Sequence, residues 1–339
     1  MAQESTSTGM DTNEPEDMNL LANQVIGVQE QTFSQKFWYV VRRWPIVPMA
    51  ILAMMVFAGV FAPLLSPTGP REINLRGRAA PPTWQNEWYE ANPKNEQRYL
   101  LGADHVGRDV LSRMLHGARI SLMVAAISLT AGVVIGSAVG LIAGYYGGWV
   151  DEFAMRTVDV WNALPFLLIA ILAAVTFGQS VSIVMILLAL VAWAGGVRNV
   201  RAEVLTLKTR DYIALARIAG ASDIRILIKH ILPGVVNTIV VLATLRVGGL
   251  ILAEASLSFL GAGIPSATPT WGNMISEGRE WLSTAWWIAV FPGIAILLVV
   301  MSMNFLGDWL RDRWDPKLRQ LWGGLGSEIR DPLSHRERA

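Results

Sequence analysis

Two charged residues, Arg246 and Glu254, lie inside one long apolar stretch of the sequence. A charge near the middle of a bilayer costs on the order of 3 kcal/mol or more, so such residues usually face a helix-bundle interior or water. Helical residues eight positions apart lie about 80° apart around the axis, so both side chains could border one cavity. The spacing favours a role in lining a transport pathway, with a structural ion pair or an interfacial position as the alternatives.

The sequence holds no pattern typical of catalysis, and no Ser-His-Asp array is evident. It has no Cys, which removes thiolate nucleophiles and Cys metal ligands. It has no G-x-x-x-x-G-K-[ST] loop, so the chain itself is not expected to bind ATP. The histidines form no pair at metal-ligand spacing: His105, His116, His230 and His335. We therefore expect that this chain binds no metal ion and no cofactor and that it is not an enzyme. The energy for transport would come from partner chains.

The polar segment 198–233, RNVRAEVLTLKTRDYIALARIAGASDIRILIKHILP, lies between two apolar stretches. It contains seven Lys or Arg against three acidic residues, and basic loops between membrane spans lie in the cytoplasm. One helical pattern ends at Gly220, which suits a left-handed C-terminal cap, and Ser222 is a good N-cap for the next helix. The sequence thus predicts a structured cytoplasmic loop.

Residues 221–231 form the second helical pattern of this loop. Its apolar residues recur at helical spacing and make one ridge: Ile224, Leu227, Ile228 and Ile231. A short helix turned across the membrane plane could seat this ridge in a groove of a partner protein. It could equally lie on anionic lipid.

The composition is that of a membrane protein. The 339 residues are 53% hydrophobic and 16% charged, whereas soluble domains carry about 25% charged residues. A helix needs roughly 20 apolar residues to cross a bilayer. The candidate spans are Val47–Leu65, Ile120 to about Tyr145, two within Val160–Val197 separated at Phe177-Gly178-Gln179-Ser180, about Val235–Leu257 and about Ala285–Leu306. We predict an all-α membrane protein with six transmembrane helices.

Basic residues near both ends of the chain place the N- and C-termini in the cytoplasm: Arg42, Arg43, Arg311, Arg313, Lys317 and Arg319. The expected organisation is a disordered cytoplasmic tail (1–35), an N-terminal helix with the first span (36–66), an extracytoplasmic loop (67–118), a core domain (119–310) and a cytoplasmic C-terminal tail (311–339). The loop 67–118 is itself basic, which opposes this orientation. At about 50 residues, it is near the length where charge stops governing topology.

A glycine stripe runs along the second predicted span: Gly132, Gly136, Gly140 and Gly144. Residues four apart share a helix face, and without side chains they let another helix approach closely. We predict packing within the chain, with an interface to another subunit as the alternative.

Three smaller features carry positional predictions. The amphipathic segment 107–119 is expected to lie at the outer membrane interface. Asp159 is expected to favour the N-terminal dipole of the third span. An aromatic belt is expected at the outer end of the last span, formed by Trp271, Trp281, Trp286 and Trp287.

The segment YIALARIAGASDIRILIKHILP resembles the EAA loop of ABC importer permeases. In that family a Glu-Ala-Ala triplet precedes a Gly, and a Leu-Pro pair lies thirteen residues beyond it. Gly220 and Leu232-Pro233 fit this register. Ala214-Leu215-Ala216 stands in place of the triplet, so the family's Glu is absent.

Other segments resemble the dipeptide, oligopeptide and nickel permeases of the C type. They are LGADHVGRDVLSRMLHGARISL (100–122), ILAEASLSFLGAGIPSATPTWGNMISEGR (251–279) and NFLGDWLRDRWDPKLR (304–319). The resemblance covers roughly residues 36–319. It implies the type I permease fold of ABC importers.

The resemblance also implies partners and cargo. The partners would be a second related permease subunit, two ATP-binding subunits, an extracytoplasmic substrate-binding protein and the lipid bilayer, with no nucleic acid. The cargo would be peptides crossing a cell inner membrane. The ATPase-coupling residues would be Ala214, Ala216, Gly220, Ala221, Ser222, Asp223, Leu227, Ile228, Leu232 and Pro233.

Two other classes remain alternatives to an importer subunit. A secondary transporter or channel that needs no ATPase should show intramembrane ion sites or inverted repeats, and the sequence shows neither clearly. A purely structural membrane subunit is the third class. Uptake by a deletion strain would separate the structural class from both transporters.

Overall fold

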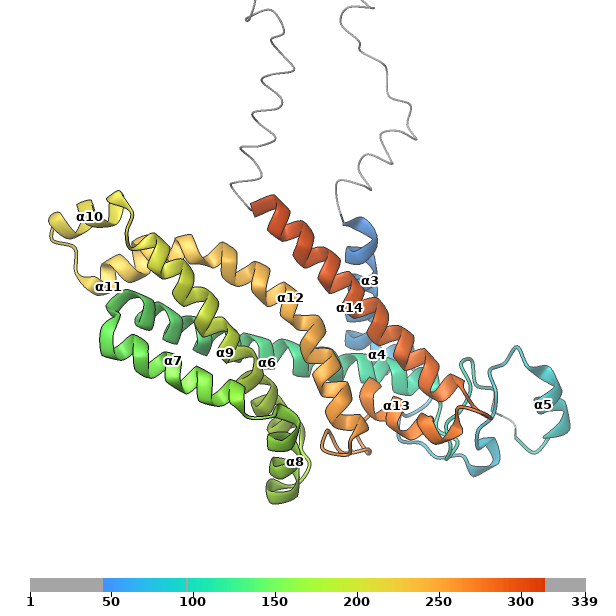
Figure 1. The fold of residues 1–339 in the computed structure, drawn as a ribbon. Helices are drawn as coiled ribbons and strands as arrows, with labels where there is room; N and C mark the ends of the chain where they lie inside the picture. The colour runs from blue at the N-terminus through green and yellow to red at the C-terminus, as the bar shows by residue number, and fades with distance from the viewer. Residues whose placement is uncertain (1–44, 96, 315–339) are drawn as a thin grey trace, which may run out of the picture. The chain divides into compact units, whose positions relative to one another are not determined.

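The computed structural model describes residues 45–95 and 97–314, and the regular structure within these ranges is almost entirely helical (Figure 1). The only β character there is an isolated bridge between Ala103 and Asp109. The all-α class is therefore confirmed. The predictions for residues 1–35, for Arg42 and Arg43 and for Lys317 and Arg319 lie outside the described residues.

The described helices follow one another along the chain with short connections. In order they are α3 (Ile46–Val60), α4 (Ala62–Leu65), η1 (Leu75–Gly77), α5 (Asn86–Ala91), α6 (Val110–Tyr146), α7 (Gly148–Ala163), α8 (Phe166–Phe177), α9 (Val181–Leu207), α10 (Asp211–Ile218), α11 (Asp223–Ile226), the π-helical turn η2 (Leu227–Ile231), α12 (Leu232–Phe259), α13 (Trp271–Gly278), η3 (Arg279–Trp281) and α14 (Trp287–Trp314).

Four helices are long and apolar enough to cross a membrane: α6, α9, the continuous helix 223–259 and α14. Helices α7 and α8 together qualify as a fifth span, with a bend of 80° between them. Helix α3 has 15 residues, fewer than the roughly 20 that a crossing needs, and a break at Phe61 separates it from α4. The chain is thus a multi-pass membrane protein, while the count of six crossings stays a prediction.

Helix α6 begins at Val110 rather than at Ile120, because Asp109 caps it. The Asp109 carboxylate accepts a hydrogen bond from the backbone N–H of Ser112 at 2.7 Å. Val110 is buried in one cluster with Trp287 of α14. The apolar side of the segment 107–119 is therefore partly covered by other helices of the chain, and its place at the outer membrane interface stays a prediction.

The connection after α6 is itself a helix, α7. Gly147 and Gly148 both have positive φ, and they end α6 and start α7. Val158 of α7 is buried in a cluster with residues of α9. Pro165 then caps α8 and holds Leu164 extended. The third predicted span is therefore assembled from two helices.

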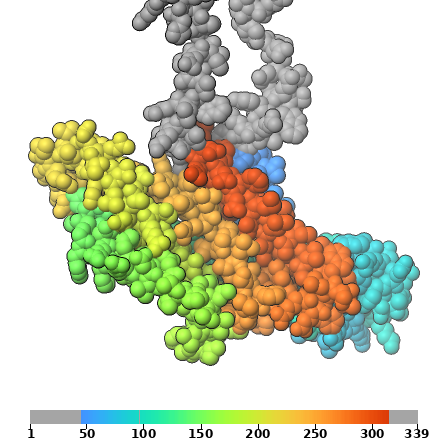
Figure 2. All heavy atoms as spheres, viewed as in Figure 1, coloured from blue at the N-terminus to red at the C-terminus, as the bar shows by residue number. Residues whose placement is uncertain are grey.

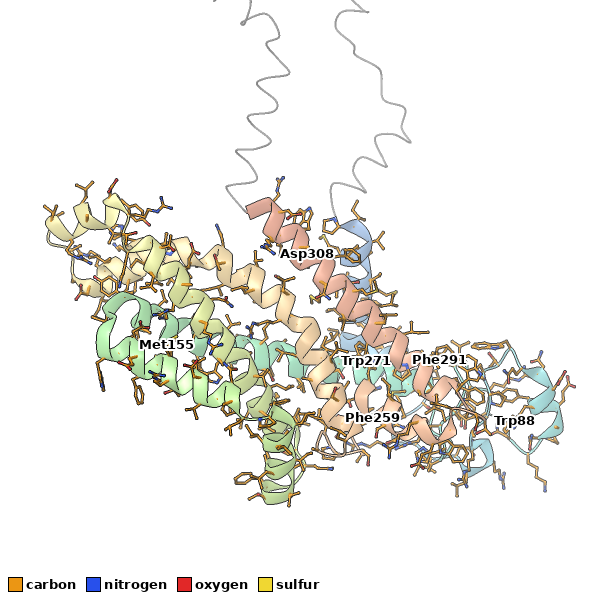
Figure 3. The ribbon with its side chains drawn as sticks, in the orientation of Figure 1. Trp88, Met155, Phe259, Trp271, Phe291 and Asp308 are labelled. Atoms are coloured by element: carbon orange, nitrogen blue, oxygen red, sulfur yellow. The ribbon has the colours of Figure 1, made fainter. Side chains whose placement is uncertain are left out.

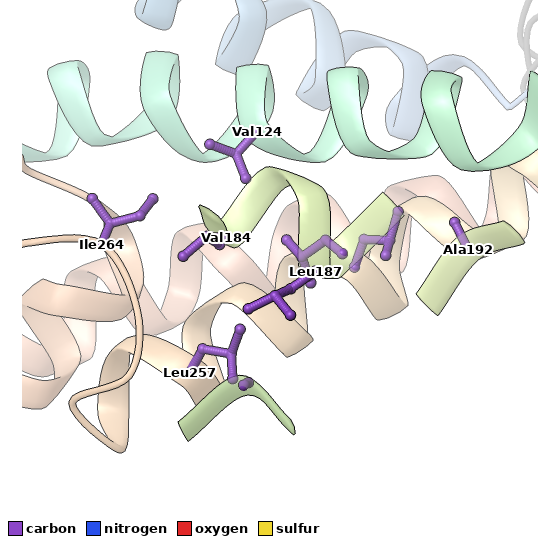
Figure 4. Close-up of a cluster of buried hydrophobic side chains, with 9 residues drawn as sticks. Val124, Val184, Leu187, Ala192, Leu257 and Ile264 are labelled. Atoms are coloured by element: carbon purple, nitrogen blue, oxygen red, sulfur yellow. The ribbon is translucent and has the colours of Figure 1, made fainter. Parts of the chain in front are cut away.

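The glycine stripe of α6 packs against α9 in the same chain. All four glycines are buried, and an added methyl group would meet the backbone or a Cβ atom of α9 at each of them. At Gly136 the obstacle is the carbonyl oxygen of Trp193, which cannot rotate away. Farther along the same helix pair, Val124 of α6 packs against Val184 and Leu187 of α9 (Figure 4).

Replacing Gly136 by Ala is expected to lower the free energy of unfolding by about 1–3 kcal/mol, because α6 and α9 must separate to admit the methyl group. Gly249→Ala in α12 is the matched control, since nothing lies within 4 Å of a methyl group there and Ala favours helix. Thermal unfolding of the purified chain measures both. Equal unfolding midpoints for the two variants would refute the close approach.

Helix α13 between α12 and α14 was not indicated by the sequence (Figures 1 and 3). Trp271, its first residue, is buried, and its indole N–H donates to the Met114 carbonyl at 3.1 Å. Trp287 is also buried and donates to the Ala103 carbonyl at 3.0 Å. The aromatic-belt prediction is wrong for these two, because each indole has a carbonyl partner inside the protein.

Candidate functional site

The two short helices α10 and α11 lie at one end of the long helices, and α5 lies at the opposite end (Figures 1 and 2). Helix α9 continues to Leu207, so the predicted loop 198–233 begins inside a helix. From Asp223 the chain is helical without interruption to the end of α12. The prediction that 221–231 forms a helix of its own is therefore wrong, because this segment is continuous with α12, while its direction relative to the membrane plane stays a prediction. A wider π-helical turn directly before Pro233 leaves room for the ring of a residue that lacks an N–H.

The corner between α10 and α11 has the cap that the sequence indicated. Gly220 has a φ of +78°, a conformation that side-chain-bearing residues rarely adopt. Its N–H bonds to the Arg217 carbonyl at 3.1 Å, and the N–H of Ala221 bonds to the Ala216 carbonyl at 3.1 Å. Ser222 occupies the N-cap position of α11 without a side-chain hydrogen bond. The cap of α10 thus consists of backbone hydrogen bonds and the positive φ of Gly220.

Buried side chains fasten this corner to the long helices. Ile213 of α10, Ile226 of α11 and Ile231 of the π-turn are fully buried in one cluster with residues of α6, α9 and α12. The hydroxyl of Tyr145 at the end of α6 donates to the Asp223 carboxylate at 2.6 Å. Helices α10 and α11 are therefore attached to α6, α9 and α12 by buried contacts.

The outer side of the corner is aliphatic and uncovered. Four large side chains form what we call the loop patch: Leu215 (64% exposed), Ile218 (83%), Ile224 (67%) and Ile228 (58%). The predicted ridge therefore splits, because Ile231 is buried and Leu227 packs partly against the interior cluster. Clustered exposed aliphatic side chains mark an interaction surface more often than single ones do.

The remaining predicted coupling residues surround the loop patch. Ala214, Ser222, Asp223 and Pro233 are exposed, whereas Ala216, Ala221 and Leu232 are partly covered. Exposed Arg217, Arg225 and Lys229 add positive charge at the same corner. The structure thus brings these residues to one end of the bundle. Their part in coupling stays a prediction.

Other basic residues of the segment bind within the chain. The Arg198 guanidinium contacts the Asp159 carboxylate of α7 at 2.5 Å. Arg201 pairs with Asp151, and Lys208 donates to the Gly144 carbonyl at 2.9 Å. Asp159 lies near the C-terminal end of α7, so the prediction that its charge favours the dipole at the N-terminus of a helix is wrong.

Arg246 and Glu254 contact different neighbours. Glu254 is 1% exposed, and its carboxylate accepts hydrogen bonds from Ser258 at 2.9 Å and from Ser121 at 3.4 Å. Arg246 reaches α9, where it donates to the Ala192 carbonyl at 3.4 Å and borders a crevice that Glu254 does not line. Pathway lining stays a prediction for both residues.

A buried ion network near the start of α6 was not predicted from the sequence. The Arg113 guanidinium contacts the Asp104 carboxylate at 2.5 Å and the Glu277 carboxylate of α13 at 2.6 Å. Arg108 contacts the same two carboxylates at 2.6 and 2.7 Å. The only signal was Arg113 itself, a charge in what proved to be a buried helical segment.

Electrostatics within this network favour the charged form of Asp104. Burial alone would raise the pKa of its carboxyl, but the charges of Arg113 and Arg108 and two backbone N–H groups outweigh burial and lower the pKa. Asp104, His105 and Glu277 also lie close enough together to hold a metal ion. Two guanidinium groups already occupy these carboxylates and would repel a cation, so we assign no metal here.

Comparison with known proteins agrees with these features. The family model described as "Binding-protein-dependent transport system inner membrane component" matches residues 136–320, which include the loop patch, Arg246 and Glu254. The dipeptide transport system permease protein DppC of Escherichia coli strain K12 is 40% identical over 288 residues, covering 84% of this chain and 94% of that protein. The glutathione transport system permease protein GsiD of Pectobacterium atrosepticum is 45% identical over 221 residues, covering 65% of this chain and 73% of that protein.

Two further matches are one relative found by sequence and one solved structure. The di/tripeptide transport system permease protein DppC of Pseudomonas aeruginosa strain UCBPP-PA14 is 37% identical, covering 80% of this chain and 87% of that protein. Among solved structures, an inward-facing MetNI methionine ABC transporter aligns with a TM-score of 0.47 at 22% identity, covering 57% of this chain and 92% of the matched chain.

Proposed function

Because the chain belongs to the family of binding-protein-dependent transport system inner membrane components, we propose that it forms half of a translocation pathway for peptides in an ABC importer. It is a membrane transport permease, and ATP hydrolysis is assigned to partner chains. Its own sequence has no phosphate-binding loop of the G-x-x-x-x-G-K-[ST] type. The membrane is the cell inner membrane, with both chain ends in the cytoplasm.

The loop patch is the observation that carries the coupling proposal. It presents four exposed aliphatic side chains on a corner that buried side chains fasten to three long helices. An ATP-binding subunit with an apolar groove would cover these side chains, and the basic residues beside them would favour an acidic rim on that groove. Movement of the docked subunit would then shift α6, α9 and α12 together.

Peptide cargo is supported by the relatives. Their names assign them dipeptides, di- and tripeptides and glutathione, all of which are short peptides with a free carboxylate. The importer would contain two ATP-binding subunits, a second related permease subunit and an extracytoplasmic substrate-binding protein. The lipid bilayer covers the remaining apolar helix faces.

Affinity purification of the tagged chain from native membranes tests the assignment. We expect two ATP-binding subunits and a second permease to purify with it, and a deletion strain to lose uptake of a labelled dipeptide until the chain is supplied. The lysate of a strain that lacks the tag is the control. Dipeptide uptake by the chain without any ATPase would instead identify a secondary transporter.

A further inference from the structure

Arg246 in α12 places its guanidinium against the backbone of α9. Its Nη1 donates to the Ala192 carbonyl at 3.4 Å, a long hydrogen bond. The guanidinium lies over Gly195, where a methyl group would overlap it. The absence of a side chain at Gly195 is therefore what admits this charge between the two helices.

The positive charge of Arg246 has no compensating carboxylate among the residues that the structure describes. Across residues 45–95 and 97–314, no carboxylate makes an ion pair with it. Arg246 is partly buried between α9 and α12. A guanidinium that is partly withdrawn from water and has no anion beside it is destabilising, and charges inside membrane proteins are usually paired or functional. The guanidinium can therefore accept negative charge from outside the described residues.

A second polar group opens into the same crevice. Ser137 of α6 is 8% exposed, and its hydroxyl has no hydrogen-bond partner among the described residues. Ser137 and Arg246 both line the crevice between α6, α9 and α12, together with Val133, Ala192 and Ile239. The other lining residues are apolar as well, which strengthens the interaction of the two polar groups with an anion.

The size and chemistry of the crevice restrict its ligand. Its volume is about 10 Å³, room for about one water-sized group such as a single oxygen atom, and not for a whole peptide. A guanidinium donates two parallel hydrogen bonds to a carboxylate, and a hydroxyl beside it can donate a third. A carboxylate at the end of a larger molecule could place one oxygen in the crevice while the rest of the molecule stays outside.

We propose that Arg246 and Ser137 form a carboxylate-binding site that holds the terminal carboxylate of a peptide during transport. This inference rests on the proposed function, because it names the group by which this permease recognises its cargo. An acidic side chain of the second permease subunit could supply the same chemistry. The experiment must therefore separate a carboxylate on the peptide from one on the partner.

Binding of a labelled dipeptide to the assembled permease–ATPase complex in nanodiscs tests the proposal. The binding protein is left out, so its own preference for a carboxylate does not enter. The competitors are the unlabelled dipeptide and its C-terminal amide. We expect the acid to compete about tenfold better than the amide with the unaltered chain, and equally well as the amide with Arg246→Gln.

Ser137→Ala keeps the guanidinium and is expected to show an intermediate preference for the acid over the amide. This variant therefore tests the proposal if Arg246→Gln fails to fold. Gly249→Ala on the same helix is the control and is expected to keep the full preference, since nothing lies near an added methyl group. An undiminished preference for the acid in Arg246→Gln, or no saturable binding to the unaltered complex, would overturn the proposal.

Two further outcomes are informative. The first shows whether the carboxylate belongs to the partner subunit, and the second shows whether the proposed function itself fails. Loss of the second permease from Arg246→Gln preparations, with the acid preference of Ser137→Ala unchanged, would assign the carboxylate to the partner subunit and overturn the proposal. Dipeptide uptake by the complete importer is measured in parallel. If the unaltered importer takes up no dipeptide, the proposed peptide cargo itself is wrong.

Discussion

Ile218→Asp is expected to reduce peptide uptake by the assembled importer at least about 30-fold while the chain remains folded in the membrane. Ile218 is the most exposed member of the loop patch at 83%, and it lies outside the buried cluster that holds the corner. A carboxylate there would be buried without a partner when an ATP-binding subunit docks. Central apolar contacts of interfaces contribute about 2 kcal/mol or more, which corresponds to the stated factor.

The measurements are dipeptide uptake and the amount of ATP-binding subunit that purifies with the tagged chain. Ile218→Leu keeps an aliphatic side chain and is expected to retain both. Leu75→Asp places the same charge on an exposed aliphatic position of η1, outside the loop patch, and is expected to retain the ATPase. If Ile218→Asp holds as much ATPase as Leu75→Asp, the loop patch is not the docking surface.

Arg113→Ala is expected to lower the free energy of unfolding by about 3–5 kcal/mol, the range for breaking a buried ion pair. The side chains of Arg113 and Asp104 are each 1% exposed. Removal of the guanidinium leaves two carboxylates, Asp104 and Glu277, to share the single guanidinium of Arg108. The excess negative charge is desolvated, and α13 loses an attachment to α6.

Thermal unfolding of the purified chain compares Arg113→Ala with Arg156→Ala. Arg156 pairs with Glu152 on the exposed side of α7 at 3.6 Å, so its loss is expected to cost less than about 1 kcal/mol. Similar unfolding midpoints would show that the network contributes little.

Acid should weaken the same network. Because the pKa of Asp104 is lowered in the folded chain, its contribution to stability is complete above about pH 4 and is lost as the pH falls through the lowered pKa.

The apolar stretches of the third to sixth predicted spans could be recognised in the sequence. Such stretches depend only on composition and on residues that are close along the chain. The break between α8 and α9 follows from Gly178 and its neighbours, and the corner at Gly220 follows from a single residue that tolerates positive φ. Helix ends were predicted less well. Asp109 extends α6 beyond its apolar run, and α9 continues ten residues past Val197 to Leu207.

For the candidate site, the sequence located the segment but not its exposed face. The ridge pattern of 221–231 contained Ile224, Ile228 and Ile231, yet only the first two are exposed. Periodicity shows which residues share a helix face, but the neighbouring elements determine which face is covered. Here the ends of α6 and α9 cover Ile226 and Ile231, which leaves α10 to complete the loop patch.

The membrane class, the basic segment with its glycine corner and the charge of Arg246 inside an apolar stretch can all be read from the amino-acid sequence, because each depends on a local run of residues. Which side chains meet depends on the packing of the folded chain. This packing brings Arg113 to Glu277 across 164 positions of sequence and places Ser137 and Arg246 in one crevice. Such pairings depend on how distant helices pack, and no local pattern of residues encodes that.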